Sequence, residues 1–256
     1  MVKSASRVLD LLEMFAVIPV PLGVSEVARR LRLPKSSAQA LLQTLTTSGY
    51  LVRIGLEYEM DPTLKGGGWV GGLRWHLVRL AKPILAESAA LSGETVILGL
   101  IQPDFYVRYI AKVVSPQAVH YDPALDPPRP THSCSTGLLH LASLPEQEFE
   151  DWLSRTELTP HARNTVTDPK ILRAMMPKIR EQGYAESMDG YANGASGISY
   201  PVIDVMGRML GAIHLSAPTE RYLRDRAKIS KEARQAAGRL SKALQALGQE
   251  GRSSLL

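Results

Sequence analysis

The sequence has only one cysteine, Cys134, among its 256 residues, so the chain cannot close an internal disulfide. A protein without disulfides is typical of a reducing compartment, and we expect it in the cytoplasm. No apolar run approaches the roughly 20 residues that a membrane-spanning helix needs. Asp10 and Glu13 interrupt the N-terminal apolar stretch, which is therefore not a secretory signal. The sequence predicts a soluble intracellular protein.

The sequence also lacks the motifs that mark common catalytic and cofactor sites. It has no G-x-S-x-G nucleophile elbow, no paired Cys/His spacing for zinc, and no G-x-G-x-x-G or phosphate-loop pattern. The stretch GGGWVGG at 66–72 is not followed by a Lys-Ser/Thr pair. We therefore expect no catalytic residues, no metal site and no cofactor. A hydrolase site is an alternative without a positive signal, and it would draw on Ser133, Ser135, His132, His140, His214 and Asp189.

The chain does contain enough apolar material for a large core, and it carries a moderate excess of positive charge. Hydrophobic residues make up 45% of the sequence, and 30 Lys and Arg stand against 25 Asp and Glu, for a net charge of +5. The length suits one large domain or two smaller ones. The charge permits a polyanionic partner without requiring one.

The first fifty residues have the pattern of three short helices. Apolar residues recur at helical spacing within 4–16, and Ser25 is a good N-cap for a second helix. Leu33-Pro34 separates that helix from a third, which ends at Gly49. The second and third helices would pack together through Val27, Ala28, Leu31, Leu33, Ala38, Leu41 and Leu42.

A hairpin is expected next, because YLVRIGLEYEM at 50–60 contains two short strand patterns around Gly55-Leu56. Leu51 and Tyr58 suit its inner face. Three helices followed by such a hairpin form a winged helix-turn-helix, which we place at residues 1–63.

The start and outer face of the third predicted helix are polar and basic. In a helix-turn-helix, the second helix of the motif enters the major groove, where its N-terminal residues meet base edges and phosphates. Serine and glutamine bond to base edges, and lysine neutralises phosphate. Five basic residues lie between positions 25 and 53, against one acidic residue, Glu26. The expected DNA contacts are Ser25, Lys35, Ser36, Ser37, Gln39, Gln43 and Arg53.

Beyond the hairpin, the sequence predicts a linker and then a mixed domain. A glycine-rich run at 66–72 precedes a helical pattern that begins near Leu73, and we place a linker helix at 64–92. The run is either a flexible connector or a weakened helix start, because glycine costs roughly 1 kcal/mol per helical position. The rest, 93–256, contains two expected strand pairs, at 94–114 and 198–218, and helices after Cys134, within 168–184 and at 220–247. The expected fold class is α+β with an antiparallel sheet.

Six stretches, which together span nearly the whole chain, form an ordered set: SRVLDLLEMF, GVSEVARRLRLPKSSAQALLQTLTTSGYLVR, LAKPILAESAALSGETVILGL, THSCSTGLLHLASL, IREQGYAESMDGYANGASGISYPVID and GRMLGAIHLSAPTERY. In sequence and in order they resemble the IclR family of bacterial transcription regulators. The resemblance implies a winged helix-turn-helix, a linker helix and a C-terminal effector-binding domain of the GAF-like kind. It also implies a homodimer or homotetramer that binds a palindromic double-stranded DNA operator.

The resemblance further implies where a small-molecule effector binds. Family pockets use the loop before the STG helix, the segment MDGYANGASGISYPV and the strand AIHLSAP. The matching residues here are Ser135, Thr136, Asp189, Gly197, His214 and Ser216. We expect them to hold a small organic acid, with the backbone N–H groups of Ser135 and Thr136 and the Ser216 hydroxyl on its carboxylate. Its aromatic ring would be covered by Tyr106, Tyr121 and Met188.

Several positions depart from the family pattern. The usual Gly-Lys pair is Gly137-Leu138 here, His214 replaces a small hydroxyl residue, and Asp189 stands where glutamate is common. The glycine run at 66–72 also differs from the usual linker. Two other classes of function stay open at this stage: a hydrolase-like enzyme with an accessory winged-helix domain, and a winged-helix assembly protein that does not bind DNA.

Overall fold

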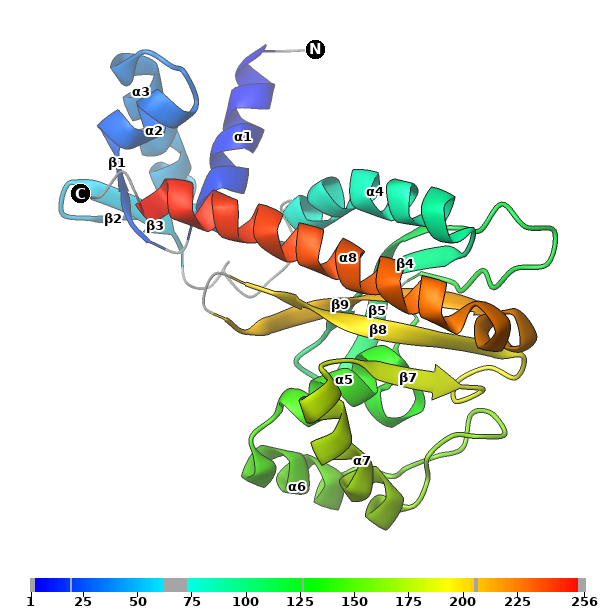
Figure 1. Cartoon of the computed structure of the whole chain (residues 1–256). Coiled ribbons are helices and arrows are strands. Elements are labelled where there is room, and N and C mark those ends of the chain that lie inside the picture. The colour runs from blue at the N-terminus through cyan, green and yellow to red at the C-terminus, as the bar shows by residue number, and fades with distance from the viewer. Residues whose placement is uncertain (1–2, 19, 62–72, 126, 205–206, 253–256) are drawn as a thin grey trace. The chain divides into compact units, whose positions relative to one another are not determined.

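The structure is a computed structural model that describes residues 3–18, 20–61, 73–125, 127–204 and 207–252 (Figure 1). These residues form two compact units, one with the described residues up to Arg79 and from Ala246 on, the other from Leu80 to Gln245. Helices α4 (Leu73–Ser92) and α8 (Thr219–Arg252) contribute residues to both units. The glycine run at 66–72 lies outside the described residues.

The N-terminal unit packs three helices, α1 (Lys3–Val17), α2 (Val24–Arg30) and α3 (Lys35–Thr47), around one apolar core. Its most deeply buried side chains include Leu11, Val27 and Leu42. The spacing of apolar residues predicted these buried faces correctly. Beyond α3 the chain turns at Gly49, which has a positive φ of 79°, as the predicted helix end requires.

A small antiparallel sheet completes this unit, with the order β1-β3-β2. Its strands are β1 (Leu22–Gly23), β2 (Leu51–Ile54) and β3 (Glu57–Met60). The predicted inner-face residues Leu51 and Tyr58 are buried, which confirms the hairpin. Strand β1 was not predicted, because two residues are too few to show the alternation of a strand.

The predicted N-cap at Ser25 is wrong. Helix α2 begins at Val24, and its N-cap is Gly23, which is extended at φ −79° and ψ 158°. Gly23 also pairs with Glu57 in the sheet, so the chain enters the helix directly from a strand. Ser25 therefore lies inside the first turn, with its side chain exposed.

The C-terminal unit contains an antiparallel six-stranded sheet with the order β6-β5-β4-β9-β8-β7. Its strands are β4 (Thr95–Ile101), β5 (Tyr106–Val113), β6 (Arg129–Pro130), β7 (Ala185–Met188), β8 (Ala195–Ile203) and β9 (Met209–Pro218). The two predicted strand pairs, β4 with β5 and β8 with β9, are confirmed. The short edge strands β6 and β7 were not predicted.

Helices cover both faces of this sheet (Figure 1). Helices α4 and α8 lie on one face. On the other face, a short 3-10 turn (Thr131–Ser133) leads into α5 (Ser135–Ser143). Helices α6 (Glu146–Arg155) and α7 (Pro169–Gln182) lie on the same side of the sheet as α5. Helix α7 lies within the predicted range 168–184. Asp168 caps its start by accepting a hydrogen bond from the Lys170 backbone, and Gly183, left-handed at φ 73°, ends it.

The alternation of strand residues decides which side chains reach α5. On β9, His214 contacts Ser135 of α5. Ile213 and Leu215 point to the opposite face, because successive side chains of a strand alternate. Ser199 of β8 lies directly opposite His214 in the register, and Gly197 lies opposite Ser216. Polar residues of β8 and β9 therefore gather on the face that α5 covers.

Candidate functional site

Helix α3 carries the predicted DNA-contacting face of the N-terminal unit. It buries Ala38, Leu42 and Leu45 in the core. Its opposite side is solvent-exposed at Lys35, Ser36, Gln39 and Gln43, while Ser37 is half-buried. The polar front of this helix is thus available to a partner and is not used in packing.

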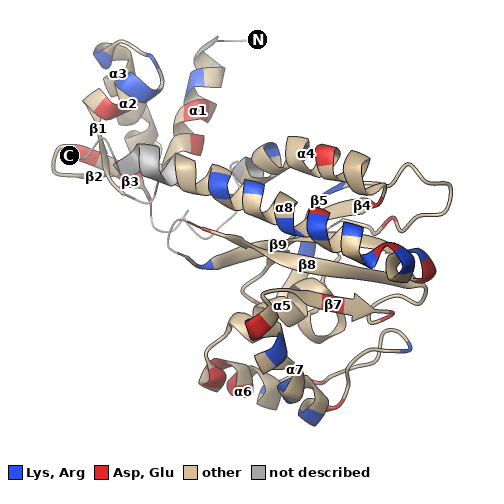
Figure 2. Cartoon of the chain, viewed as in Figure 1, with Lys and Arg blue, Asp and Glu red and all other residues tan. Residues whose placement is uncertain are grey.

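The basic charge near α3 is partly paired within the protein. The Arg29 Nη2 lies 2.7 Å from the Glu26 Oε1, and Arg30 pairs with the same carboxylate. On the hairpin, Arg53 donates from Nε to the Gly55 carbonyl at 2.8 Å. Lys35 has no carboxylate within ion-pair distance among the described residues. Figure 2 shows the Lys and Arg residues around the α2–α3 connection.

A buried cluster of hydroxyl groups surrounds His214 in the C-terminal unit. The Ser135 Oγ lies 3.1 Å from the His214 Nδ1 and 2.8 Å from the Ser199 Oγ. The Ser199 Oγ is also 3.2 Å from the same ring nitrogen and 3.0 Å from the Thr136 Oγ1. All four side chains are buried. The structure thus brings together Ser135, Thr136 and His214 and adds Ser199, which was not predicted.

His214 is neutral at physiological pH. Its pKa is lowered to about 4, chiefly by burial; a hydrogen bond with the Ile198 backbone acts against this shift, and the positive charge of Arg129 adds to it. A neutral imidazole offers hydrogen bonds but no charge. Of the two roles expected for His214 toward an acid, hydrogen bonding is the one that this environment favours.

Two glycines allow the backbone to approach this cluster closely. A Cβ at Gly137 would lie 2.2 Å from the Thr131 carbonyl oxygen, so α5 could not start in this position with a larger residue. A Cβ at Gly197 would lie 2.5 Å from the His214 Cε1. The neighbouring Ser216 is also buried, and its Oγ donates to the Ser196 carbonyl at 3.2 Å.

A buried arginine lies beside this cluster. The Arg129 side chain comes from the edge strand β6 and is 3% exposed. It donates from Nη1 to the Pro127 carbonyl at 2.9 Å and from Nη2 to the Ala124 carbonyl at 2.7 Å. The Arg129 Nε has no hydrogen-bond partner among the residues that the structure describes. The guanidinium carbon lies 3.9 Å from the Tyr109 ring centroid and 5.4 Å from that of Tyr191.

Tyr109 joins the arginine to the hydroxyl cluster. Its ring stacks on His214 with the centroids 5.8 Å apart and 20° between the planes. Cys134 packs beside Tyr109, and burial raises the pKa of its thiol to about 11. The thiol is therefore protonated and behaves as a small apolar group. Arg129, Tyr109, His214 and the hydroxyl cluster form one continuous buried polar site.

The Asp189 carboxylate bonds to Gly194, Thr219 and Arg163, which are not members of the hydroxyl cluster around His214. Its Oδ1 accepts from the Gly194 backbone at 2.6 Å and from the Thr219 Oγ1 at 2.9 Å, and its Oδ2 accepts from the Arg163 Nε at 3.0 Å. The residue itself is left-handed at φ 52°. Its carboxylate thus fixes the turn that carries Tyr191.

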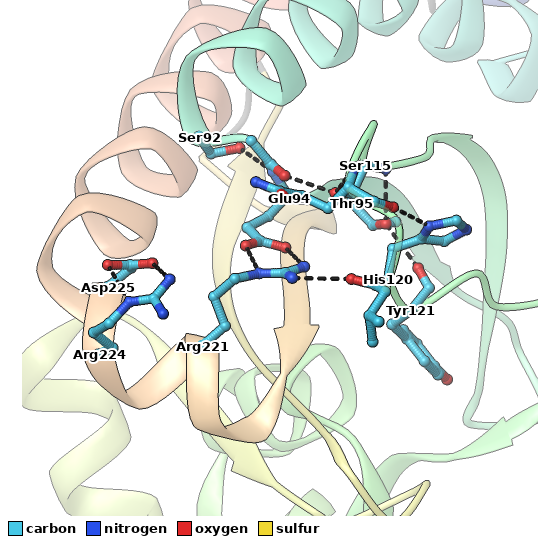
Figure 3. Close-up of polar contacts among 12 residues, drawn as sticks. Ser92, Glu94, Thr95, Ser115, His120, Tyr121, Arg221, Arg224 and Asp225 are labelled. Carbon is cyan, nitrogen blue, oxygen red and sulfur yellow. Dashed lines mark hydrogen bonds and ion pairs between the residues drawn. The ribbon is translucent and has the colours of Figure 1, made fainter.

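The segment between β5 and β6 is fastened to the sheet and to α8 (Figure 3). The Thr95 Oγ1 donates to the Tyr121 carbonyl at 2.7 Å and accepts from the Ser115 backbone at 3.1 Å. Arg221 of α8 donates to the Val119 carbonyl at 2.9 Å and pairs with Glu94. The Tyr121 ring points away from this network in Figure 3. The same segment supplies the Ala124 and Pro127 carbonyls on which Arg129 is held.

The predicted ring-covering residues do not all lie in this site. Tyr106 is 41% exposed and Met188 is 37% exposed, whereas Tyr121 is half-buried. Tyr191 and Ser199 were missed, although both belong to the segment MDGYANGASGISYPV that the resemblance indicated. Arg129 was also missed, because nothing in the local pattern PPRP marks an arginine as buried.

Neither a metal-binding cluster nor a membrane-spanning helix is found among the described residues. They contain no group of three or more His, Cys, Asp or Glu side chains placed to hold a metal ion. None of their helices is long and apolar enough to cross a bilayer. His214 approaches two serines, but no described carboxylate bonds to its ring, so the third member of a hydrolase triad is missing there.

Comparisons with known proteins agree with both units. The IclR helix-turn-helix domain matches residues 4–55, and the bacterial transcriptional regulator IclR C-terminal domain matches residues 73–242. The HTH-type transcriptional regulator KdgR of Escherichia coli (strain K12) is 27% identical over 233 residues, which cover 88% of each chain. The Pca regulon regulatory protein of Pseudomonas putida is 23% identical over 222 residues, or 86% of this chain and 76% of that one.

A solved structure has the same fold. It is an IclR homolog complexed with 4-hydroxybenzoate, from Microbacterium hydrocarbonoxydans, with a TM-score of 0.63 and 24% identity over 94% of this chain and 99% of that one. The family resemblance and the α+β fold class are thus confirmed. Because IclR-family regulators are not enzymes, the hydrolase alternative is excluded. The chain belongs to the IclR family of bacterial transcriptional regulators, with an N-terminal helix-turn-helix that binds DNA and a C-terminal effector domain.

Proposed function

We propose that this regulator binds a palindromic operator as a homodimer or homotetramer and responds to a small organic acid in the cytoplasm. One observation carries the DNA part of the proposal: α3 buries its apolar side and leaves Lys35, Ser36, Gln39 and Gln43 exposed. A helix with this division is suited to the major groove. A symmetric oligomer presents two such helices, and a palindrome presents two equal half-sites.

The proposed contacts follow from the positions on α3. Lys35 begins the helix, where the unpaired backbone N–H groups also favour a phosphate. Gln39 lies one turn later on the exposed side and can bond to a base edge. Ser36, Ser37 and Gln43 extend this surface, and the remaining proposed contacts, Ser25 and Arg53, flank it.

The effector is proposed to bind at the buried polar site of the C-terminal unit. Its hydrogen-bonding groups come from Ser135, Thr136, His214 and Ser216, with Gly197 providing the space that the His214 ring needs. Asp189 supports the turn beside them. The relative from Microbacterium hydrocarbonoxydans was solved in complex with 4-hydroxybenzoate, which supports an aromatic acid as the ligand class.

Two substitutions on α3 separate affinity from specificity. Lys35→Ala is expected to weaken binding similarly on all DNA sequences and to lower the slope of log affinity against log salt by about one per contact. Gln39→Ala is expected to cost about 1–3 kcal/mol on the operator and to relax the preference at one base pair. Fluorescence anisotropy with DNA from upstream of the regulator's own gene measures both effects.

Lys178→Ala is the matched control, because Lys178 is an exposed lysine on α7 of the effector unit. It removes the same charge without touching α3. Wild-type affinity and salt slope in both α3 variants would show that α3 does not read DNA. A wild-type chain that binds the upstream fragments no better than random DNA would show that these fragments do not contain the operator.

A further inference from the structure

Arg129 is a buried cation that forms no ion pair with any carboxylate of the described residues. It is 3% exposed, and no carboxylate lies within ion-pair distance of it among the described residues. A guanidinium stays charged at all physiological pH values, and burying a charge without a counter-ion is unfavourable. The other charged residues that are fully buried in the described part of the chain are all acidic, namely Glu94, Asp189, Asp204 and Glu232.

Among the described residues, only neutral groups accept hydrogen bonds from Arg129. Its two terminal nitrogens donate to the carbonyls of Ala124 and Pro127, and its Nε has no partner in the described part of the chain. A carboxylate is a stronger acceptor than a carbonyl, and its two oxygens match the fork of a guanidinium. A ligand carboxylate can therefore replace both carbonyls and supply a negative charge that no described residue provides.

The surroundings of Arg129 are aromatic. Its guanidinium lies over the Tyr109 ring at 3.9 Å and near the Tyr191 ring at 5.4 Å. Tyr121 is close enough for a hydrogen bond between its hydroxyl and Arg129, and burial raises the pKa of this tyrosine. Rings held at these distances favour a flat ligand, because aromatic groups gain both buried area and stacking.

We propose that Arg129 binds the carboxylate of an aromatic acid whose ring lies against Tyr109, Tyr121 and Tyr191. This rests on the proposed function of an acid-responsive regulator, and it names the residue that recognises the acid. The hydroxyl–imidazole cluster lies beyond the Tyr109–His214 stack. Because His214 and the serines are neutral, they suit a polar ring substituent such as a hydroxyl group, while the charge belongs to Arg129.

Replacing the two carbonyls on Arg129 by the ligand carboxylate would also affect α8, a helix that contributes residues to both units. Freeing the Ala124 and Pro127 carbonyls loosens the end of the segment between β5 and β6. The same segment is held by Arg221 at the start of α8 through the Val119 carbonyl. Binding at Arg129 can therefore change the contacts at the base of α8.

Calorimetric titration of the full chain tests the assignment. The ligands are 4-hydroxybenzoate, its neutral isostere 4-hydroxybenzamide, and cyclohexanecarboxylate as an acid without an aromatic ring. The wild-type chain is expected to bind 4-hydroxybenzoate at least 10-fold more tightly than cyclohexanecarboxylate and about 100-fold more tightly than the amide. Arg129→Met is expected to weaken acid binding about 100-fold while leaving amide binding unchanged.

Two further variants keep the test decisive. Arg129→Lys retains the charge but loses the bidentate geometry, so acid binding is expected to fall about 10-fold. If circular dichroism shows that Arg129→Met does not fold, Arg129→Lys takes its place in the test. Arg173→Met removes an exposed arginine that pairs with Glu150, and it should bind all three ligands as the wild type does.

Each outcome has one meaning. Acid binding that survives unchanged in both Arg129 variants would overturn the assignment of Arg129 and leave the acid-responsive function standing. Equal wild-type affinity for the acid and the amide would overturn carboxylate recognition by Arg129. Wild-type affinity for cyclohexanecarboxylate equal to that for 4-hydroxybenzoate would overturn the aromatic part. Wild-type binding of none of the acids would count against both this inference and the acid part of the proposed function.

Discussion

Replacing Gly137 with alanine is expected to destabilise the effector unit by at least about 3 kcal/mol, which is large for a single methyl group. The added Cβ would lie 2.2 Å from the Thr131 carbonyl oxygen, 2.3 Å from its Cα and 2.6 Å from its carbonyl carbon. All three are backbone atoms, so no side chain can rotate away. The start of α5 would have to move, and the Ser135–His214 hydrogen bond would be disturbed with it. Urea unfolding followed by circular dichroism measures the loss.

Gly238→Ala is the matched control for this substitution. Gly238 also lies in a helix, α8, but a Cβ there would have nothing within 4 Å. Alanine should therefore stabilise the chain by about 0.5–1 kcal/mol, because it restricts the unfolded state and favours the helix. Similar stability changes in the two variants would show that the close approach of α5 to Thr131 does not exist.

Removing the guanidinium of Arg221 is expected to cost about 3–5 kcal/mol, because it leaves the Glu94 carboxylate buried without a partner. Glu94 is 3% exposed in its side chain and Arg221 is 16% exposed. The ion pair joins the first turn of α8 to the start of β4, and Arg221 also holds the Val119 carbonyl (Figure 3). Arg221→Met should lower the urea midpoint strongly and loosen the segment between β5 and β6.

Two comparisons isolate the cause. The double variant Arg221→Met with Glu94→Gln removes both charges and should be clearly more stable than Arg221→Met alone. Arg224→Met breaks the neighbouring pair with Asp225, which is exposed (Figure 3). It should leave the midpoint unchanged, because exposed pairs contribute little. A double variant no more stable than Arg221→Met would show that the unpaired Glu94 charge is not the source of the loss.

Local patterns in the sequence were sufficient for most elements of the fold. The end of α7 was predictable because a glycine, Gly183, closes its amphipathic pattern. The β4–β5 pair was predictable because two apolar stretches lie within 94–114, one on each side of Pro103-Asp104. The strands that were missed, β1, β6 and β7, span two to four residues at or near sheet edges. Such strands are defined by pairing with distant residues and have no alternation of their own to detect.

The candidate site was less predictable, because its residues are distant in sequence. Ser135 and His214 are 79 positions apart, and only the family resemblance indicated that they meet. Ser199 follows from the register of β8 against β9, which a sequence does not specify. Arg129 is buried because the two-residue strand β6 pairs with β5, where Arg129 lies opposite Val107. The rings of Tyr109 and Tyr191 also pack against its guanidinium. No composition or spacing rule expresses that arrangement.

We expect an acid bound in the C-terminal unit to control DNA binding by the N-terminal unit. The direct measurement is the operator affinity of the full chain with and without saturating 4-hydroxybenzoate, made in parallel for wild type and Arg129→Met. The operator affinity of the wild type is expected to change by about 5- to 150-fold, the usual range of allosteric coupling, and that of Arg129→Met is expected to stay the same at this ligand concentration. If the operator affinity of the wild type stays the same while calorimetry shows the acid bound, the acid does not control DNA binding.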